Sequence, residues 1–253
     1  MKILNKKLII GAVFIIALVI AGVNYFMSQS RARETKESEE KPADFVVSFL
    51  DLGNMLTDVE SVLKVRVENI GDLDGSITLQ LSVKKENETD ELVDSKSVTL
   101  SGGDAKNITY TYTFEDPAEY TISVHNARQT IDVFLLIKAE DLIDEWNEDE
   151  VRAKQKYKDK EIVVYGTVDN IDIDIFGDPY IVLDEKHLFG VQCIFDNENE
   201  DLMVDLEEGD TVAVFGKCSG KIYSLFLRYI NLSARNLIEI NIEDKQAMNL
   251  VIR

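Results

Sequence analysis

Histidine and cysteine are the side chains of this sequence that react most readily near neutral pH, and the chain has two of each. His125 and His187 lie far apart, and neither stands beside a serine or cysteine nucleophile motif. The GxSxG, HExxH, GxGxxG and P-loop patterns are absent from the sequence. The sequence therefore predicts no catalytic residue, and surface positions account for both histidines.

The two cysteines fall in apolar, alternating runs, at 191–195 and 211–218. Alternation places Cys193 and Cys218 on the apolar faces of two expected strands, so the two sulfur atoms approach if both faces point into one core. One reading is a disulfide, which suits a location outside the cytoplasm. The other is two separate buried thiols that pack as small apolar groups. A zinc site that adds His187 has only three ligands at unsuitable spacing, so no metal site is predicted.

Carboxylates gather at one expected turn, where the sequence has Asp169, Asp172, Asp174 and Asp178. A second acidic turn, DLDGS, occupies residues 72–76. Neither segment has the full EF-hand pattern with its closing glutamate. Asp and Gly are also the usual residues of turns. We therefore expect turn residues and no cofactor, with a weak calcium site as the alternative.

Residues 138–238 contain the elements that must position these groups. Apolar side chains recur every three to four residues over 139–157, which predicts a helix. Five apolar runs follow and predict strands, and a short helix is expected at 200–206, between the third and fourth. The five runs are 161–173, 179–183, 190–195, 211–218 and 223–232. This order is typical of an OB-fold barrel.

Short motifs of this part resemble the tRNA-anti-like OB-fold family over residues 139–237. Ala139 and Leu142 match the opening of the family pattern. The later motifs are KYKDK (156–160), VVYGTV (163–168), VQCIF (191–195), EGDTV (208–212) and VFGKCSG (214–220). The resemblance implies a fold related to anticodon-binding domains. It implies no defined biochemical role.

Residues 44–133 have a different pattern, with strict alternation of apolar and polar side chains at 62–67, 77–83 and 108–114. Dense turn signals separate these runs. Half-buried antiparallel strands at this spacing predict an immunoglobulin- or fibronectin-like sandwich. The segments LKVRVENIG (63–71) and AEYTISV (118–124) also resemble CARDB-type adhesion-related sandwich domains. That resemblance implies a spacer or a binding module.

The N-terminal residues predict a membrane anchor. Residues 8–27 contain no charged side chain, and at about 1.5 Å per residue a helix of this length spans a bilayer's hydrocarbon core. Three lysines lie in residues 1–7, whereas residues 28–43 mix basic and acidic side chains and read as a flexible linker. This bias predicts a cytoplasmic N-terminus and extracytoplasmic C-terminal domains in the cell membrane. A cleaved signal peptide is the alternative. Residues 239–253 are a C-terminal tail to which the sequence assigns no role.

Acidic residues outnumber basic ones, 47 to 27, for a formal charge of −20. Residues 160–238 alone have six basic and fifteen acidic side chains. Such charge repels phosphate backbones, so we expect no nucleic-acid ligand.

The predicted fold class is therefore all-β: an N-terminal transmembrane helix, a β-sandwich, and a leading helix with a five-stranded OB barrel. We expect a non-enzymatic, membrane-anchored extracytoplasmic protein that binds a protein, a peptide or an envelope glycan. OB barrels bind ligands on strands 2 and 3 and the adjoining loops. The candidate ligand-binding residues there are Phe176, Tyr180, Val182, Gln192 and Ile194. The alternatives are a nucleic-acid-binding OB protein and a hydrolase built on carboxylates.

Overall fold

The computed structural model describes residues 40–186, 189–196, 203–223 and 228–239. The predicted anchor at 8–27 lies outside these residues, as do nearly all of the linker and the tail. The described residues from Ala43 onward belong to one compact unit. No helix within the described ranges is both long enough and apolar enough to cross a membrane.

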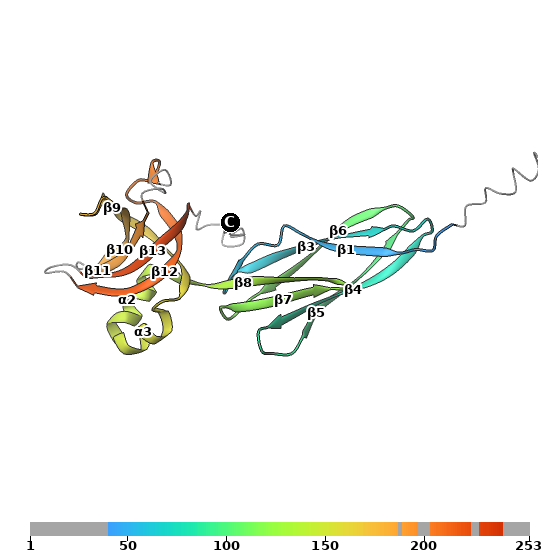
Figure 1. Ribbon diagram of the computed structural model, residues 1–253, viewed down its shortest axis with the longest axis horizontal. Helices are drawn as coiled ribbons and strands as arrows, with labels where there is room; N and C mark the ends of the chain where they lie inside the picture. The colour runs from blue at the N-terminus through green and yellow to red at the C-terminus, as the bar shows by residue number, and fades with distance from the viewer. Residues whose placement is uncertain (1–39, 187–188, 197–202, 224–227, 240–253) are drawn as a thin grey trace, which may run out of the picture. The chain divides into compact units, whose positions relative to one another are not determined.

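The first half of the described chain consists of two antiparallel sheets that share one apolar core. One sheet has the strand order β1-β3-β6, from β1 (Phe45–Leu50), β3 (Glu60–Asn69) and β6 (Ala105–Thr113). The other has the order β8-β7-β4-β5, from β4 (Gly75–Lys85), β5 (Glu91–Leu100), β7 (Ala118–Val124) and β8 (Ala127–Lys138). A short strand, β2 (Met55–Leu56), runs parallel to β8. Figure 1 shows these strands in blue to green.

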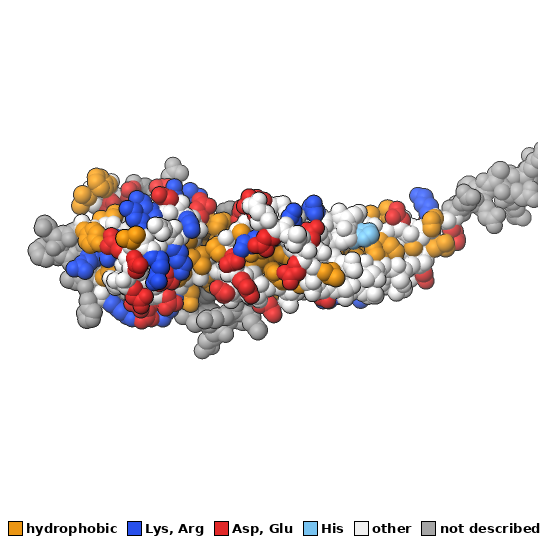
Figure 2. Space-filling model, turned by 90° about the horizontal axis from the view of Figure 1, so that it is seen from below, with side chains coloured by type: hydrophobic (Ala, Val, Ile, Leu, Met, Phe, Trp, Pro, Cys, Tyr) orange, Lys and Arg blue, Asp and Glu red, His pale blue; other side chains and the backbone are white. Residues whose placement is uncertain are grey.

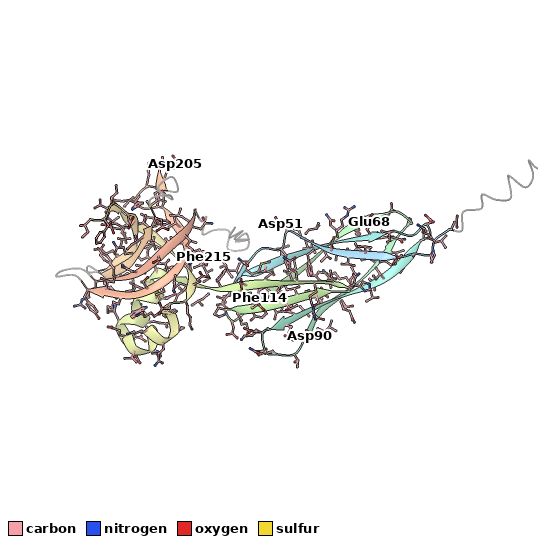
Figure 3. The ribbon with its side chains drawn as sticks, in the orientation of Figure 1. Asp51, Glu68, Asp90, Phe114, Asp205 and Phe215 are labelled. Carbon is pink, nitrogen blue, oxygen red and sulfur yellow. The ribbon has the colours of Figure 1, made fainter. Side chains whose placement is uncertain are left out.

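The alternation predicted for this half is confirmed residue by residue in β3. Val65 and Val67 are fully buried, whereas Lys64 and Arg66 on the opposite face are exposed. Phe114, which directly follows β6 and is labelled in Figure 3, is also fully buried. Its ring lies edge-on to that of Tyr120, with the ring centroids 4.8 Å apart. The period of two therefore sets which side chains form the core.

Two hydrogen-bond arrangements close the corners of these sheets. The fully buried Asn69 uses Nδ2 to donate to the carbonyl of Leu73 at 2.8 Å, and its Oδ1 accepts from the backbone N–H of Asp44 and of Gly71 at 3.1 Å. Near the start of β7, the Tyr120 hydroxyl donates to the carbonyl of Asp116, four residues earlier, at 3.1 Å. Each bond fixes a connection between strands, because it satisfies backbone groups that the ladders leave unpaired.

The second half is a closed five-stranded barrel with two helices. Its elements are α2 (Ala139–Glu148), α3 (Glu150–Tyr157), β9 (Glu161–Ile173), β10 (Pro179–Lys186), β11 (Phe189–Phe195), β12 (Thr211–Tyr223) and β13 (Arg228–Glu239). The strand order is β9-β10-β11-β13-β12, and β12 pairs with β9 again to close the ring. Only β11 and β13 are parallel among these pairs of described strands. The barrel is OB-like, and its strands appear in yellow to red in Figure 1.

The structure corrects two element boundaries in this half. The helix predicted over 139–157 is two helices, because Asp149 adopts an extended conformation (φ −152°) and its side chain accepts from the N–H of Arg152 as the cap of α3. The strand predicted at 223–232 was placed too early. Tyr223 ends β12, and β13 begins at Arg228, because β12 continues past Cys218 through an irregularity before Gly220. The helix expected at 200–206 lies partly outside the described residues.

The strand β8 belongs to both halves of the structure. Its first part pairs with β7, and Leu135–Lys138 pairs in parallel with Ile162–Tyr165 of β9. Thr57 is fully buried beside it: its N–H donates to the carbonyl of Phe134 at 3.0 Å, and its Oγ1 accepts from the N–H of Leu136 at 3.1 Å. Residues 134–137 are therefore a paired strand and not a linker.

Candidate functional site

The outer surface of β10 and β11 carries most of the predicted ligand-binding residues. Side chains one position away, such as Ile181 and Cys193, are fully buried in the barrel core. Alternation then turns Tyr180, Gln192 and Ile194 outward, and all three are half-buried. Tyr180 lies opposite Ile194 in the β10–β11 ladder, so the structure does bring these residues together.

Val182 does not reach the surface. It lies opposite Gln192 on the outward side of β10, yet it has no exposed area. Its Cγ1 lies over Gly190, where an added Cβ would come within 2.8 Å of it. Val182 therefore packs against its neighbours, and in this conformation a ligand does not touch it.

The loop between β9 and β10 presents two large apolar side chains to solvent. Ile175 is 93% exposed and Phe176 is 81% exposed. Asp174 holds the turn, because its Oδ1 accepts from the N–H of Phe176 at 2.7 Å and of Asp178 at 3.0 Å. Gly177 has φ +93°, a left-handed conformation that glycine adopts without strain. The loop therefore displays an apolar tip next to Tyr180.

The acidic side chains of this region accept hydrogen bonds from backbone N–H groups. Besides Asp174, Asp172 accepts from the N–H of Ile173 at 2.8 Å, and Asp169 accepts from the N–H of Glu185. No group of three or more His, Cys, Asp or Glu side chains in the described part of the chain is arranged to hold a metal ion. Asp174 is a turn residue as expected, whereas Asp169 and Asp172 lie within β9, so the expectation of turn residues was wrong for these two.

The strand β13 adds two residues to this surface that the sequence did not indicate. Tyr229 lies opposite Gly190, and Asn231 lies opposite Gln192 in the parallel β11–β13 ladder. Asn231 is 7% exposed, and its Oδ1 is buried without a hydrogen-bond partner. An orphaned acceptor of this kind is costly, so it marks a place where a donor is favoured. Alternation along β13 indicates Asn231 as outward-facing, but only the fold shows that β13 lies beside β11.

Two tyrosines give this surface an aromatic character within an acidic setting. Burial, followed by the nearby Asp172, raises the pKa of Tyr180. Burial, followed by the charge of Glu185, raises the pKa of Tyr229, whose hydroxyl donates to Glu185 Oε2 at 3.4 Å. Both phenols therefore stay protonated at neutral pH and can donate hydrogen bonds. We call Tyr180, Gln192, Ile194, Tyr229 and Asn231 the outer face.

Both cysteines are free thiols inside the barrel, with no exposed area. Cys193 on β11 and Cys218 on β12 both pair with Leu232, because β13 lies between these two strands. Two strand spacings separate their Cα atoms by about 9.5 Å, whereas a disulfide requires about 4.4–6.8 Å. The disulfide considered from the sequence is not formed, because a strand stands between the two thiols.

The described histidine, His125, takes no part in this surface. His125 is exposed in the turn between β7 and β8, where it has φ 54°. His187 lies outside the described residues. The described structure therefore adds no partner that would make His125 a base.

Most basic side chains of the barrel are close to carboxylates. Lys217 lies 4.0 Å from Asp159, Lys221 lies 3.8 Å from Glu150, and Arg235 pairs with Glu161. On the side of the molecule that Figure 2 shows, blue and red side chains of the barrel alternate without a continuous blue area. A single strand of nucleic acid needs a positive groove, and paired cations form a poor one.

A model of the tRNA_anti-like family matches residues 1–229 of the chain. The matched region begins well before the motifs at 139–237, so it includes the β-sandwich strands as well. No curated protein matches the sequence.

Several solved structures resemble part of the chain. One is a β-glucosidase from Listeria innocua in complex with glucose, which is 16% identical to this chain with a TM-score of 0.34. The match covers 36% of this chain and 16% of that enzyme. The β-glucosidase EmGH1 from Erythrobacter marinus is 16% identical with a TM-score of 0.34, and the match covers 36% of this chain and 15% of that enzyme. DesR, a β-glucosidase from Streptomyces venezuelae in complex with D-glucose, is 14% identical with a TM-score of 0.31. The match covers 36% of this chain and 15% of that enzyme. The chain thus spans about a sixth of these enzymes, and β-glucosidase activity is what their names say of them.

Proposed function

The chain belongs to the tRNA_anti-like family, and from that premise we propose that it is a non-enzymatic binding protein whose OB-like barrel takes a neutral ligand on its outer face. The ligand class is a glycan or peptide of the cell envelope, or a segment of another protein. The observation that carries the proposal is the buried, unpartnered Oδ1 of Asn231 on a surface that also carries two half-buried tyrosines.

The chemistry of the outer face favours a neutral glycan within that class. Tyr180 and Tyr229 offer aromatic rings, the Tyr180 hydroxyl offers a donor, and Gln192 offers an amide. The Asn231 oxygen lacks a donor, and a sugar hydroxyl or a peptide N–H supplies one. The exposed Phe176 provides a nearby apolar contact. Glu185 and Asp172 beside the tyrosines oppose an anionic ligand.

We further propose that residues 8–27 anchor the chain in the cell membrane and that the β-sandwich holds the barrel outside the cytoplasm. The apolar run and the lysines before it support this orientation. The sandwich itself fits an immunoglobulin- or fibronectin-like type. Its support is the strand order and the bond from Tyr120 to the carbonyl of Asp116, which has the form of a tyrosine corner.

The binding proposal is tested by calorimetry of the full chain with a panel of neutral envelope oligosaccharides and peptides. For the ligand that binds, Tyr180→Ala and Asn231→Leu each reduce affinity by about tenfold, since each removes a contact of about 1.4 kcal/mol. Leu92→Ala is the matched control, because Leu92 is an exposed apolar residue (58%) on β5 of the sandwich. Equal affinities of all three variants and the parent chain would contradict the outer face as the site.

The topology is tested separately by adding protease to intact cells. The described domains should be digested while a short N-terminal fragment stays in the membrane. Full protection of the barrel would place it on the other side of the membrane.

A further inference from the structure

A cavity of about 420 Å³ lies between β8 and the helices, and none of the outer-face residues lines it. Its apolar wall is formed by residues 135–137 of β8. Its other wall is formed by carboxylates of α2, which are Asp141, Asp144, Glu145 and Glu148. We call this cavity the acidic groove.

The four carboxylates repel one another along α2. Their spacing of three and four residues puts them on one side of the helix, where like charges each cost about 0.2–0.5 kcal/mol per pair. Glu145 and Glu148 also lie near the C-terminal end of α2, where the helix dipole disfavours negative charge. The last turn of α2 contains no basic residue, and the ion pairs of Glu148 with Arg152 and of Glu145 with Lys156 come from α3 and offset only part of this charge. A cation in the acidic groove relieves both penalties.

Tyr157 is an independent sign of a ligand at this place. It lines the acidic groove from α3 and has no exposed area, and its hydroxyl lacks a hydrogen-bond partner. Burial, followed by the adjacent Glu145, raises the pKa of Tyr157. The carboxylate lies close enough to act on the phenol, yet no bond of normal geometry joins the two groups. A buried hydroxyl without a partner is uncommon in a folded protein.

Lys156 shows what kind of cation fits. Its ammonium group donates to both oxygens of Glu145 at 2.9 Å and lies 4.8 Å from the centre of the Tyr157 ring. These are a charge-assisted hydrogen bond pair and a cation–π contact, the two interactions that recognise an amine on an alkyl stem. The Lys156 ammonium group thus lies in the acidic groove where a ligand cation would bind.

We propose that the acidic groove binds an alkyl-ammonium group, which displaces Lys156 from Glu145, pairs with the α2 carboxylates and reaches the Tyr157 hydroxyl. The source is either a free polyamine or a lysine side chain of a peptide. The apolar wall at 135–137 takes the alkyl stem, which a hydrated metal ion lacks. No metal-holding cluster occurs in the described ranges, which agrees with an organic cation.

The test is calorimetry of the full chain, with spermidine and with an acetylated trilysine peptide as probes at low salt. Glu145→Gln should weaken binding by about three- to fivefold, the equivalent of one exposed ion pair. Lys156→Met should strengthen binding by a similar factor, because it removes the tethered competitor. Both variants lose the same Lys156–Glu145 bonds, so a loss of folding cannot explain opposite changes in affinity. Tyr157→Phe keeps the charge and should weaken binding.

Matched controls separate a site from diffuse charge. Asp90→Asn and Lys106→Met remove one negative and one positive charge from exposed positions of the sandwich. If these variants change affinity as much as Glu145→Gln and Lys156→Met, or if neither probe binds, the proposal is wrong. Tighter binding of spermidine identifies the free polyamine as the source, and tighter binding of trilysine identifies the peptide. Tyr180→Ala should leave the affinities for both probes unchanged. A failure of binding at the acidic groove can therefore be distinguished from a failure of binding at the outer face.

Discussion

The ring of Phe134 lies against the ring of Phe215, with centroids 4.8 Å apart and planes inclined at 51°. Phe134 belongs to β8, and Phe215, labelled in Figure 3, belongs to β12 of the barrel. Leu56, Val59 and Val163 are buried in the same cluster. This cluster is separate from the cores of the sandwich and the barrel, so the contact between β8 and β12 has its own apolar core.

Phe215→Ala should therefore destabilise the protein although Phe215 lies outside the barrel core. Removing a buried phenyl ring costs about 3 kcal/mol, which lowers the midpoint of thermal unfolding by about 6–12 °C. Circular dichroism on heating measures the midpoint. Val151→Ala, at a position 70% exposed on α3, is the control and should change it little. An unchanged midpoint in Phe215→Ala would show that the cluster contributes nothing.

Asn69→Ala should also be strongly destabilising, by about 2–3 kcal/mol. The substitution leaves the part-buried carbonyl of Leu73 and the N–H groups of Asp44 and Gly71 without their partner. Urea denaturation measures the free energy of unfolding. Asn107→Ala is the control, because Asn107 is exposed on β6. A loss no larger than that of the control would mean that water replaces the amide.

The pH dependence of stability should include a contribution from Glu140. Hydrogen bonds from Lys138 and Lys186 lower the pKa of Glu140 from 4.5 to about 2. A lowered folded-state pKa means that the stabilisation is complete above pH 4.5 and is lost as the pH falls toward 2. The difference in thermal midpoint between the parent chain and Glu140→Gln should thus be present at pH 7 and vanish near pH 2. The exposed Glu91→Gln should show a smaller difference at every pH, and a constant difference for Glu140→Gln would contradict the assignment.

Both cysteines should be unreactive thiols in the native protein. Burial raises the pKa of Cys193, and it raises that of Cys218 to about 11, so almost no thiolate forms at neutral pH. A thiol reagent should modify neither residue until denaturant is added, and then both. A mass lower by two hydrogens without reductant would reveal the disulfide instead.

The barrel should not bind nucleic acid with useful affinity, although its family takes its name from anticodon-binding domains. Residues 160–238 have fifteen acidic against six basic side chains, and several of the basic ones are paired. Fluorescence anisotropy with labelled single-stranded DNA and RNA, at low and physiological salt, measures the affinity. Salt-sensitive binding near micromolar at physiological salt would favour the nucleic-acid alternative.

Local patterns predicted much of this fold from the sequence. Alternation in β3 identified Val65 and Val67 as core residues, and the predicted bounds of β9 agree with the structure. The boundary between β12 and β13 was wrong, because an irregularity before Gly220 carries β12 past the point where alternation stops being visible. Periodicity reports which way a side chain points and does not report where two strands pair.

The candidate site was harder to predict for the same reason. Tyr180, Gln192 and Ile194 follow from alternation on neighbouring strands, whereas the burial of Val182 depends on the space above Gly190. Asn231 joins the outer face only because β13 runs parallel to β11, a pairing between distant segments. Likewise, only the position of Leu232 between the thiols decides against the disulfide.

The uninterrupted course of β8 also constrains how such chains can be recombined in evolution. Side chains alternate along a strand, so inserting or deleting one residue at 134–138 would turn every later side chain of that strand to the opposite side. Leu136 and Ile137 would exchange places, and the parallel ladder to β9 would lose its register. A fusion that joins another partner at this point would therefore disturb the pairing of β8 with β7 and with β9.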